Sequence, residues 1–266
     1  MKKAIVMGAT SGIGLEVARL LAADGWQVGV AGRRGQLLDE VMSSTTGVVA
    51  VKVIDVCRED ATERLRELID DMGGIDLYVH SSGIGYQNVD LDTDKEMRTV
   101  ETNCMGFTRM LTAVYHYFAE RHRADACQGE GARHAKVYQI AAISSIAGTK
   151  GLGAAPAYSS TKRYQNHYLE CLDQQARMSH LPIRITDIRP GFVATDLIKG
   201  GTYPLQLDAR DVARTIVSAI RRRRSVVTID WRYALLVSLW RMVPRWIWVR
   251  MRVATSPNPS QGGELR

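Results

Sequence analysis

A tyrosine and a lysine four positions apart are the residues of this sequence best suited to chemistry. Tyr158 and Lys162 lie in the stretch Ala-Tyr-Ser-Ser-Thr-Lys, and residues i and i+4 of a helix project from one face. A fixed positive charge near a phenol favours the phenolate and lowers its pKa from about 10. The spacing therefore predicts that Tyr158 is a general acid or base, although a surface lysine beside a packed tyrosine has the same spacing.

A glycine-rich turn near the start of the chain predicts a nucleotide site. The apolar run at residues 3–7 predicts a strand, and the apolar periodicity of residues 15–21 predicts a helix. Glycines permit a tight turn between them, and the N–H groups at a helix N-terminus attract a pyrophosphate. The residues expected to contact the phosphates are Gly8, Thr10, Ser11, Gly12, Ile13 and Gly14.

These two motifs together resemble the short-chain dehydrogenase/reductase family, which has GxxxGxG followed far downstream by YxxxK. Asn103 matches the family's active-site asparagine, and Ser145, thirteen residues before Tyr158, matches its serine. The resemblance runs from about Lys3 to Thr195. It includes the PGxxxT segment that lines the nicotinamide, with Pro190, Gly191, Val193 and Thr195.

The resemblance implies hydride transfer between a nicotinamide and a carbonyl carbon. Tyr158 would give a proton to the carbonyl oxygen, and Ser145 would donate a second hydrogen bond to it. Lys162 would hold the nicotinamide ribose and tune the phenol, and Asn103 would position a water that links Lys162 to solvent. Each residue also has a structural alternative, such as a strand-end cap for Ser145, a helix-bending polar residue for Asn103 or a solvated helix charge for Lys162.

The end of the second predicted strand favours NADP(H) over NAD(H). An NAD enzyme of this fold would place an acidic residue there to bind the ribose 2′-hydroxyl, whereas this sequence has Arg33 and Arg34. Arginine suits bidentate pairing with a 2′-phosphate, although the pair is also compatible with a solvated loop. Asp55 and Val56 resemble the family's adenine-contacting pair.

One segment departs from the family's pattern. Where the family commonly has NNAG, this sequence reads His-Ser-Ser-Gly at residues 80–83. Ser82 and Gly83 are small enough to let the backbone pass close to the adenine ribose, so cofactor binding is expected to persist. His80 is expected to be a structural residue rather than an acid or base.

Length and pattern predict one domain of the α/β class, a single-domain Rossmann-type doubly wound parallel sheet with helices on both faces. The chain has 266 residues, of which 45% are hydrophobic and 24% charged, enough for one substantial core. Strands are expected near Ala4, Val28, Val51, Leu77, Val137 and Ile185 and at residues 225–229. The domain is expected over 1–254, with the cofactor-binding core at about 1–195 and the substrate loop and C-terminal elements at about 196–254. Residues 120–135 are expected to form a surface loop and residues 255–266 a disordered tail.

The spacing of the cysteines and the distribution of charge argue against a metal site and against nucleic-acid binding. The four cysteines are widely spaced without a CxxC pair, which predicts reduced thiols, no metal site and a cytoplasmic location. The net charge of +7 is scattered apart from four arginines at 221–224, and no nucleic-acid recognition motif accompanies it. Nucleic acid is therefore not expected as a partner.

The stretch at residues 231–253 is rich in tryptophan and arginine. Arginines and a proline interrupt its apolar residues well before the roughly 20 needed to span a membrane. Three interpretations stay open for it: the wall of a substrate pocket, a subunit interface, or a helix lying on an anionic membrane surface. The preceding stretch at 196–204 resembles the family's substrate loop and has no obvious charged anchor, which favours a neutral or apolar carbonyl compound.

These observations predict an NADP(H)-dependent oxidoreductase that interconverts an alcohol and a ketone or aldehyde. The resemblance implies a homodimer or homotetramer. Two alternatives stay open. A nucleotide-binding regulator of the same fold would keep the glycines but could lose the catalytic residues, and this sequence has all four of them. A sugar epimerase or dehydratase would share Tyr158 and Lys162, although such relatives usually show GxxGxxG and longer substrate domains.

Overall fold

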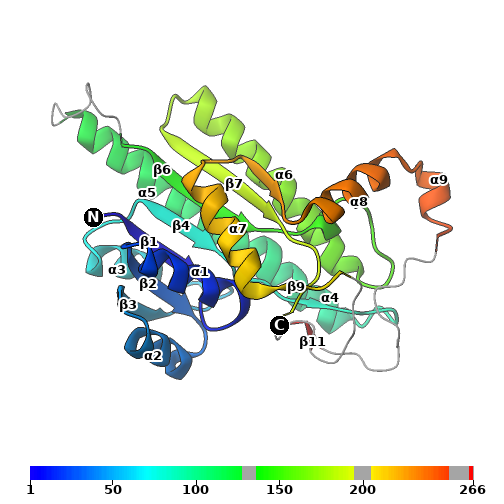
Figure 1. The fold of residues 1–266 in the computed structure, drawn as a ribbon, viewed down its shortest axis with the longest axis horizontal. Coiled ribbons are helices and arrows are strands. Elements are labelled where there is room, and N and C mark those ends of the chain that lie inside the picture. The colour runs from blue at the N-terminus through cyan, green and yellow to red at the C-terminus, as the bar shows by residue number, and fades with distance from the viewer. Residues whose placement is uncertain (128–135, 195–204, 252–263, 266) are drawn as a thin grey trace.

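A parallel sheet of seven strands forms the centre of the protein, with the order β10-β7-β6-β4-β1-β2-β3 (Figure 1). The structure is a computed structural model that describes residues 1–127, 136–194, 205–251 and 264–265. The strands are β1 (Lys3–Met7), β2 (Gln27–Gly32), β3 (Val48–Val53), β4 (Leu77–His80), β6 (Tyr138–Ile143), β7 (Ile183–Arg189) and β10 (Val226–Thr228). The strand order reverses between β1 and β4. In open sheets of this kind, ligands bind beside that reversal at the carboxyl ends of the strands.

Helices cover both faces of the sheet, which confirms the predicted Rossmann-type α/β fold in a single domain. One face carries α1 (Gly12–Ala23), α2 (Gly35–Ser44) and α7 (Ala209–Arg221). The other face carries α3 (Ala61–Asp71), α5 (Phe107–Cys127) and α6 (Pro156–Met178). The predicted final strand at 225–229 is present as β10.

Alternate residues of the central strands supply the two hydrophobic cores. Ile5 and Met7 of β1 pack with α3, α5 and α6, whereas Ala4 and Val6 pack with α1, α2 and α7. All four side chains are fully buried. Successive side chains of a strand point to opposite faces, and helices cover both faces here, so the strand has to be apolar along its whole length.

The helical stretch between β5 (Gly85–Tyr86) and β6 is interrupted. α4 (Thr93–Val100) is capped by Asp92, whose carboxylate accepts hydrogen bonds from the N–H groups of Asp94 and Lys95 at 3.0 and 3.2 Å. A π-helical turn, η1 (Glu101–Gly106), separates α4 from α5. Such turns often occur at functional sites, and this one carries Asn103.

The prediction of a surface loop over residues 120–135 is wrong for the first half of that range. α5 continues without a break to Cys127, because buried Phe118 and Ala119 keep its apolar face on the sheet up to that point. The polar residues that follow, 120–127, form the last turns of the helix. Residues 128–135 lie outside the described part of the chain.

Two short strand pairs lie outside the main sheet. β8 (Val193–Ala194) pairs with β9 (Leu207–Asp208), and β5 (Gly85–Tyr86) pairs with β11 (Glu264–Leu265). Glu264–Leu265 belongs to the stretch that was expected to be a disordered tail. The rest of that stretch, the expected substrate loop at 196–204 and the predicted cofactor contact Thr195 lie outside the described residues.

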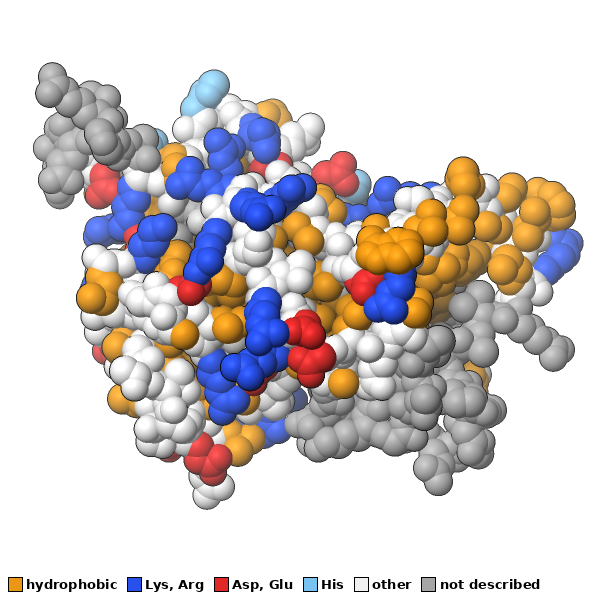
Figure 2. All heavy atoms as spheres, viewed as in Figure 1, with side chains coloured by type: hydrophobic (Ala, Val, Ile, Leu, Met, Phe, Trp, Pro, Cys, Tyr) orange, Lys and Arg blue, Asp and Glu red, His pale blue; other side chains and the backbone are white. Residues whose placement is uncertain are grey.

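The tryptophan- and arginine-rich stretch forms two helices after β10, α8 (Trp231–Met242) and α9 (Arg245–Trp248). Hydrophobic side chains gather on the protein surface over these helices, on the right of Figure 2. Within the described ranges, no helix combines the length and apolar character that a membrane span requires.

Candidate active site

The glycine-rich turn between β1 and α1 is packed so tightly that side chains do not fit at two of its glycines. Gly8 has a φ of +85°, and a Cβ there would lie 2.7 Å from the backbone nitrogen of Ser82. A Cβ on Gly14 would lie 2.2 Å from the carbonyl oxygen of Gly8. At these two positions the turn packs directly against backbone atoms, a close approach that fits a phosphate-binding turn.

The N-terminus of α1 offers backbone donors to an anion. Ser11 occupies the cap position, but its side chain makes no capping hydrogen bond, and the first turn holds no acidic residue. Gly12, Ile13 and Gly14 are the first residues of the helix, where N–H groups have no partner within the helix. These donors and the helix dipole fit a phosphate group.

Arg34 reaches the phosphate turn from the end of β2. Its Nη2 atom donates to the hydroxyl oxygens of Thr10 and Ser11 at 2.6 and 2.7 Å, and its Nε atom donates to Thr10 at 3.1 Å. Arg33 is also exposed at this edge of the sheet. The structure thus joins three predicted cofactor residues, Thr10, Ser11 and Arg34, in one hydrogen-bonded group with an exposed positive charge.

The other predicted adenosine-side residues line the same edge of the sheet. Asp55 follows β3 and accepts a hydrogen bond from the N–H of Cys57 at 3.1 Å. Val56 is buried against Gly106, where a Cβ would lie 2.7 Å from it. Ser82 and Gly83 follow β4, with Ser82 against Gly8 and Gly83 close to Asn103.

Ser145 and Tyr158 approach each other from β6 and α6. Ser145 caps η3 (Ile146–Gly148), and its hydroxyl oxygen accepts from the N–H of Ala147 at 3.0 Å. The predicted contact Pro190, which follows β7, holds this segment, since its carbonyl accepts from the N–H of Ile146 at 3.1 Å. Tyr158 lies in the first turn of α6 and hydrogen-bonds with Ser145.

Lys162 is buried one turn after Tyr158. Its ammonium donates to the carbonyl of Ile143 at 3.1 Å and to Oε1 of Gln165 at 2.9 Å, and lies 5.7 Å from the centre of the Tyr158 ring. Burial lowers the pKa of Lys162 to about 8, and the negative charge of Asp187 opposes this shift. A lysine with this pKa can exchange a proton near neutral pH.

Burial also reverses the expected direction of the pKa shift of Tyr158. The sequence argument predicted that Lys162 would lower the pKa of Tyr158, but the removal of the phenol from water raises it. The hydrogen bond with Ser145 acts in the opposite, lowering direction. The prediction of a net lowering is therefore wrong for this structure, because desolvation of the phenolate is the larger effect.

Asn103 is fully hydrogen-bonded within the protein. Its Oδ1 atom accepts from the N–H of Ile84 at 2.9 Å, and its Nδ2 atom donates to the Ile84 carbonyl at 2.6 Å and to Thr161 at 3.1 Å. The sequence predicted a water between Asn103 and Lys162. That water stays a prediction. Within the protein, Gln165 links the two residues: its Nε2 donates to the Asn103 carbonyl at 2.9 Å, and its Oε1 accepts from Lys162.

Gln165 and two glycines are site residues that the sequence reasoning missed. A Cβ on Gly85 would lie 2.3 Å from the Tyr158 ring, and one on Gly148 would lie 2.2 Å from Oδ1 of Asn166. Gln165 lies three residues after Lys162 and is completely buried. The i, i+3 spacing of Gln165 from Lys162 was a usable signal, whereas the glycines carried none without knowledge of α6 packing against them.

His80 has a structural role, as expected. It is buried at the end of β4, its Nδ1 atom hydrogen-bonds with the hydroxyl of Tyr78 at 3.0 Å, and its ring packs edge-on against Phe107. Burial, followed by the positive charge of Lys162, lowers the pKa of His80 to about 3. The ring is therefore neutral at ordinary pH.

The remaining predicted contacts follow β7. A Cβ on Gly191 would lie 2.2 Å from the ring of Tyr233 of α8, so only glycine fits there. Val193 is buried and begins β8. The segment after Pro190 is thus fixed against both η3 and α8.

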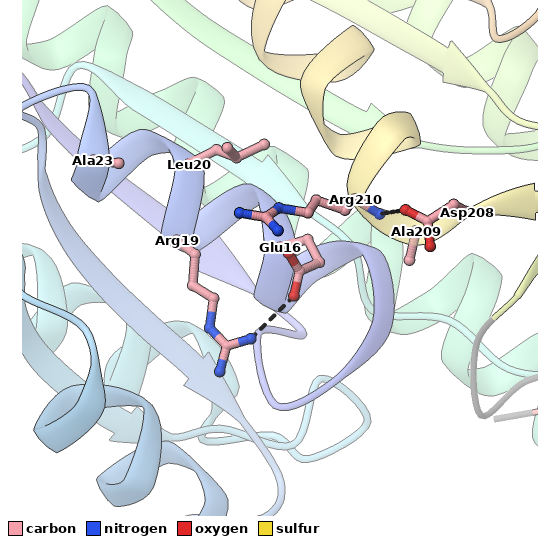
Figure 3. A pocket seen from close by; sticks show the side chains of 7 residues that line it. All are labelled: Glu16, Arg19, Leu20, Ala23, Asp208, Ala209 and Arg210. Atoms are coloured by element: carbon pink, nitrogen blue, oxygen red, sulfur yellow. Dashed lines mark hydrogen bonds and ion pairs between the residues drawn. The ribbon is translucent and has the colours of Figure 1, made fainter.

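A surface hollow between α1 and the start of α7 lies apart from this site (Figure 3). Arg19 and Glu16 form an ion pair of 3.0 Å at its edge. The other residues that line the hollow are Leu20, Ala23, Asp208, Ala209 and Arg210. None of them belongs to the predicted catalytic or cofactor-contacting set.

Comparisons with known proteins agree with this geometry. A family model described as short chain dehydrogenase matches residues 2–202. An uncharacterized oxidoreductase of Myxococcus xanthus is 30% identical over 252 residues, covering 91% of this chain and 93% of the relative. A short-chain dehydrogenase from Sphingobium yanoikuyae in complex with NADPH superposes with a TM-score of 0.74 at 18% identity, over 96% and 98% of the two chains. A short chain dehydrogenase/reductase from Burkholderia phymatum in complex with NAD gives 0.73 at 18% identity, over 90% and 92%. The two structural matches show the same fold.

Proposed function

This chain belongs to the short-chain dehydrogenase family of oxidoreductases, and on that premise we propose that it is an NADP(H)-dependent enzyme that interconverts an alcohol and a ketone or aldehyde. The observation that carries this proposal is the set of polar residues beside the phosphate turn. Tyr158 hydrogen-bonds with Ser145, and buried Lys162 is joined through Gln165 to the carbonyl of Asn103. Buried polar groups arranged in this way, at the same sheet edge as a turn suited to phosphates, suit proton transfer.

The phosphate turn would hold the pyrophosphate of a nicotinamide dinucleotide, and Arg34, with Arg33 beside it, would pair with a 2′-phosphate. Nicotinamide cofactors of both kinds are bound by proteins of the same fold, NADPH in one and NAD in another. The choice of NADP(H) for this chain depends on the two arginines and on the lack of a carboxylate at residues 27–34. When bound, the nicotinamide supplies or accepts the hydride.

The protein's own side chains would handle the proton. In carbonyl reduction, the phenol of Tyr158 gives its proton to the carbonyl oxygen as negative charge develops there. The Ser145 oxygen accepts from the N–H of Ala147, and its hydroxyl makes only a long hydrogen bond of 3.5 Å to the Pro190 carbonyl. The hydroxyl would exchange that long bond for a second hydrogen bond to the carbonyl oxygen of the substrate. The ammonium of Lys162, with a pKa of about 8, then returns a proton toward Tyr158.

Gln165 would be a positioning residue for Lys162. Its carbonyl oxygen accepts from the ammonium, which favours the charged form, and its amide is anchored on the Asn103 carbonyl. Gln165→Leu removes this acceptor, so the pKa of Lys162 should fall further. We expect the rate of carbonyl reduction at pH 7 to fall about tenfold or more. The decline of activity at high pH should move to lower pH.

The opposite substitution provides the control. Gln165→Glu places a carboxylate beside the ammonium and should move the high-pH decline upward, since an opposite charge favours protonated Lys162. The measurement is kcat as a function of pH for both variants and the unchanged protein. Identical shifts in both variants, or no shift in either, would show that Gln165 does not tune Lys162.

The arginine assignment predicts a selective loss of NADPH affinity. Arg34→Ala should weaken NADPH binding about 10- to 100-fold, the range for a lost charge-assisted hydrogen bond, and NADH binding far less. Arg33→Ala tests the second arginine in the same way. Arg19→Ala, which removes an exposed arginine paired with Glu16, is the matched control. The measurement is the dissociation constant of NADPH and of NADH for each variant, followed by cofactor fluorescence. If Arg34→Ala weakens the binding of NADPH and NADH equally, the 2′-phosphate contact is ruled out.

The function itself is tested by mixing the purified protein with NADPH and a panel of apolar ketones and aldehydes. Loss of reduced-nicotinamide absorbance with at least one of them is the expected result. A protein that binds NADPH but turns over no carbonyl or alcohol would be the non-catalytic regulator that the sequence left open.

A further inference from the structure

The helices α8 and α9 present an unusually apolar surface to solvent. Its large side chains are between 36% and 75% exposed, with Trp231 at 75%, Met242 at 71% and Trp246 at 65%. We define the α8–α9 surface by these exposed residues: Trp231, Leu235, Leu239, Met242, Trp246, Ile247, Val249 and Met251. Hydrophobic side chains gather over α8 and α9 at the right of Figure 2. Patches of this kind mark an interaction site.

The charge of the same segment has one sign. Residues 231–251 contain four arginines and no aspartate or glutamate. Arg232 pairs with Asp230 at the start of α8, at 2.7 Å. The side chains of Arg241, Arg245 and Arg250 are exposed beside the apolar residues. The partner of this surface therefore has to accept large apolar side chains and carry negative charge.

The segment is held firmly to the candidate active site. Trp248 donates from Nε1 to the carbonyl of Gly151 at 2.7 Å, and Lys150 donates to the carbonyl of Val243 at 2.8 Å. Lys150 and Gly151 follow the turn that begins at Ser145. Tyr233 accepts a hydrogen bond from the N–H of Phe192, in the segment after Pro190, at 3.2 Å. The α8–α9 surface is thus a fixed part of the domain.

We propose that the α8–α9 surface docks the protein on the surface of an anionic lipid bilayer. A tryptophan-rich apolar face flanked by arginines matches the boundary between acyl chains and negatively charged headgroups. Neither helix is long enough to cross the bilayer: α8 has 12 residues and α9 has 4. The segment therefore lies in the plane of the interface.

Charge and exposure disfavour the two other interpretations of this segment. A pocket wall would face the protein interior, whereas Trp231 and Trp246 face solvent. An interface between two copies related by a two-fold axis would bring the same surface of each copy together. It would place the arginines of one copy near those of the other, with no carboxylate in the segment to pair with them.

The test is cosedimentation of the full-length protein with lipid vesicles. We expect binding to vesicles of phosphatidylcholine mixed with phosphatidylglycerol, little binding to phosphatidylcholine alone, and a loss of binding as salt is raised. Arg241→Gln combined with Arg245→Gln should reduce the partition coefficient about 25-fold, since each arginine contributes about fivefold. Trp231→Ser combined with Trp246→Ser should reduce it at least tenfold.

The control is Arg222→Gln combined with Arg223→Gln, which removes the same charge from exposed positions at the end of α7. Circular dichroism and the thermal unfolding midpoint verify that every variant is folded. Equal losses in the control and in Arg241→Gln/Arg245→Gln would overturn the proposal, as would equal binding to neutral and anionic vesicles or no binding to either. So would a native dimer that the tryptophan variant converts to monomers without a change in vesicle binding, because the surface would then join two copies of the chain.

Discussion

Replacing Tyr158 by Phe is expected to lower the rate of carbonyl reduction about 10²- to 10⁴-fold, the usual contribution of a general acid. The substitution removes only the hydroxyl that hydrogen-bonds with Ser145 and keeps the ring that packs against Gly85. The affinity for NADPH should therefore change little. Steady-state rates with the best carbonyl substrate, together with NADPH titration, measure both effects.

Tyr164→Phe is the matched control for this prediction. Tyr164 lies on the same helix, is 38% exposed and hydrogen-bonds with Thr108 at 2.6 Å, so the loss of its hydroxyl should leave kcat within about twofold, as for surface substitutions in general. Turnover by Tyr158→Phe at a rate close to that of Tyr164→Phe would show that Tyr158 is not the proton donor.

Replacing Asp187 by Ala is expected to destabilise the protein by about 3–5 kcal/mol, because it leaves a partly buried charge without its partner. Asp187 of β7 is 3% exposed. Its carboxylate accepts from Nη2 of Arg189 at 2.6 Å, from Nδ2 of Asn166 at 3.2 Å and from the hydroxyl of Ser144. These contacts join β6, β7 and α6 directly behind Ser145 and Lys162.

Chemical denaturation measures this effect, with Asp70→Ala as the control. Asp70 forms a 3.8 Å ion pair with Arg66 on α3, where both side chains are more than half exposed. Such exposed pairs contribute about 0–1 kcal/mol, so the two variants should differ by several kcal/mol. If Asp187→Ala lowers the free energy of unfolding no more than Asp70→Ala does, the contacts of Asp187 with Ser144, Asn166 and Arg189 do not stabilise the fold.

The arrangement of the fold followed from local patterns. The apolar run of β1 and the glycines after it predicted a buried strand and a phosphate turn, since only strands covered on both faces are apolar throughout. Ala4 and Val6 in one core, with Ile5 and Met7 in the other, match that pattern. The apolar periodicity of α5 did not indicate where the helix ends, because the polar residues after Phe118 have the composition of a loop.

The candidate site was predictable only in part. The order and spacing of Ser145, Tyr158 and Lys162 indicated the site because those residues recur at set intervals in a known family. The i, i+3 spacing of Gln165 from Lys162 was a weaker signal, since a polar residue on a helix is usually solvated. Its role follows from the approach of η1, which brings the carbonyl of Asn103 within 2.9 Å.

The sequence by itself determined the class of fold and the candidates for a phosphate turn and for proton transfer, because these depend on residue type and spacing along one or two elements. The tertiary structure decided the environment of those residues. Burial raises the pKa of Tyr158 and lowers that of Lys162, and the packing of α8 and α9 leaves the tryptophans of the α8–α9 surface in solvent. Both effects depend on which segments distant in the chain come together, and no local pattern carries that information.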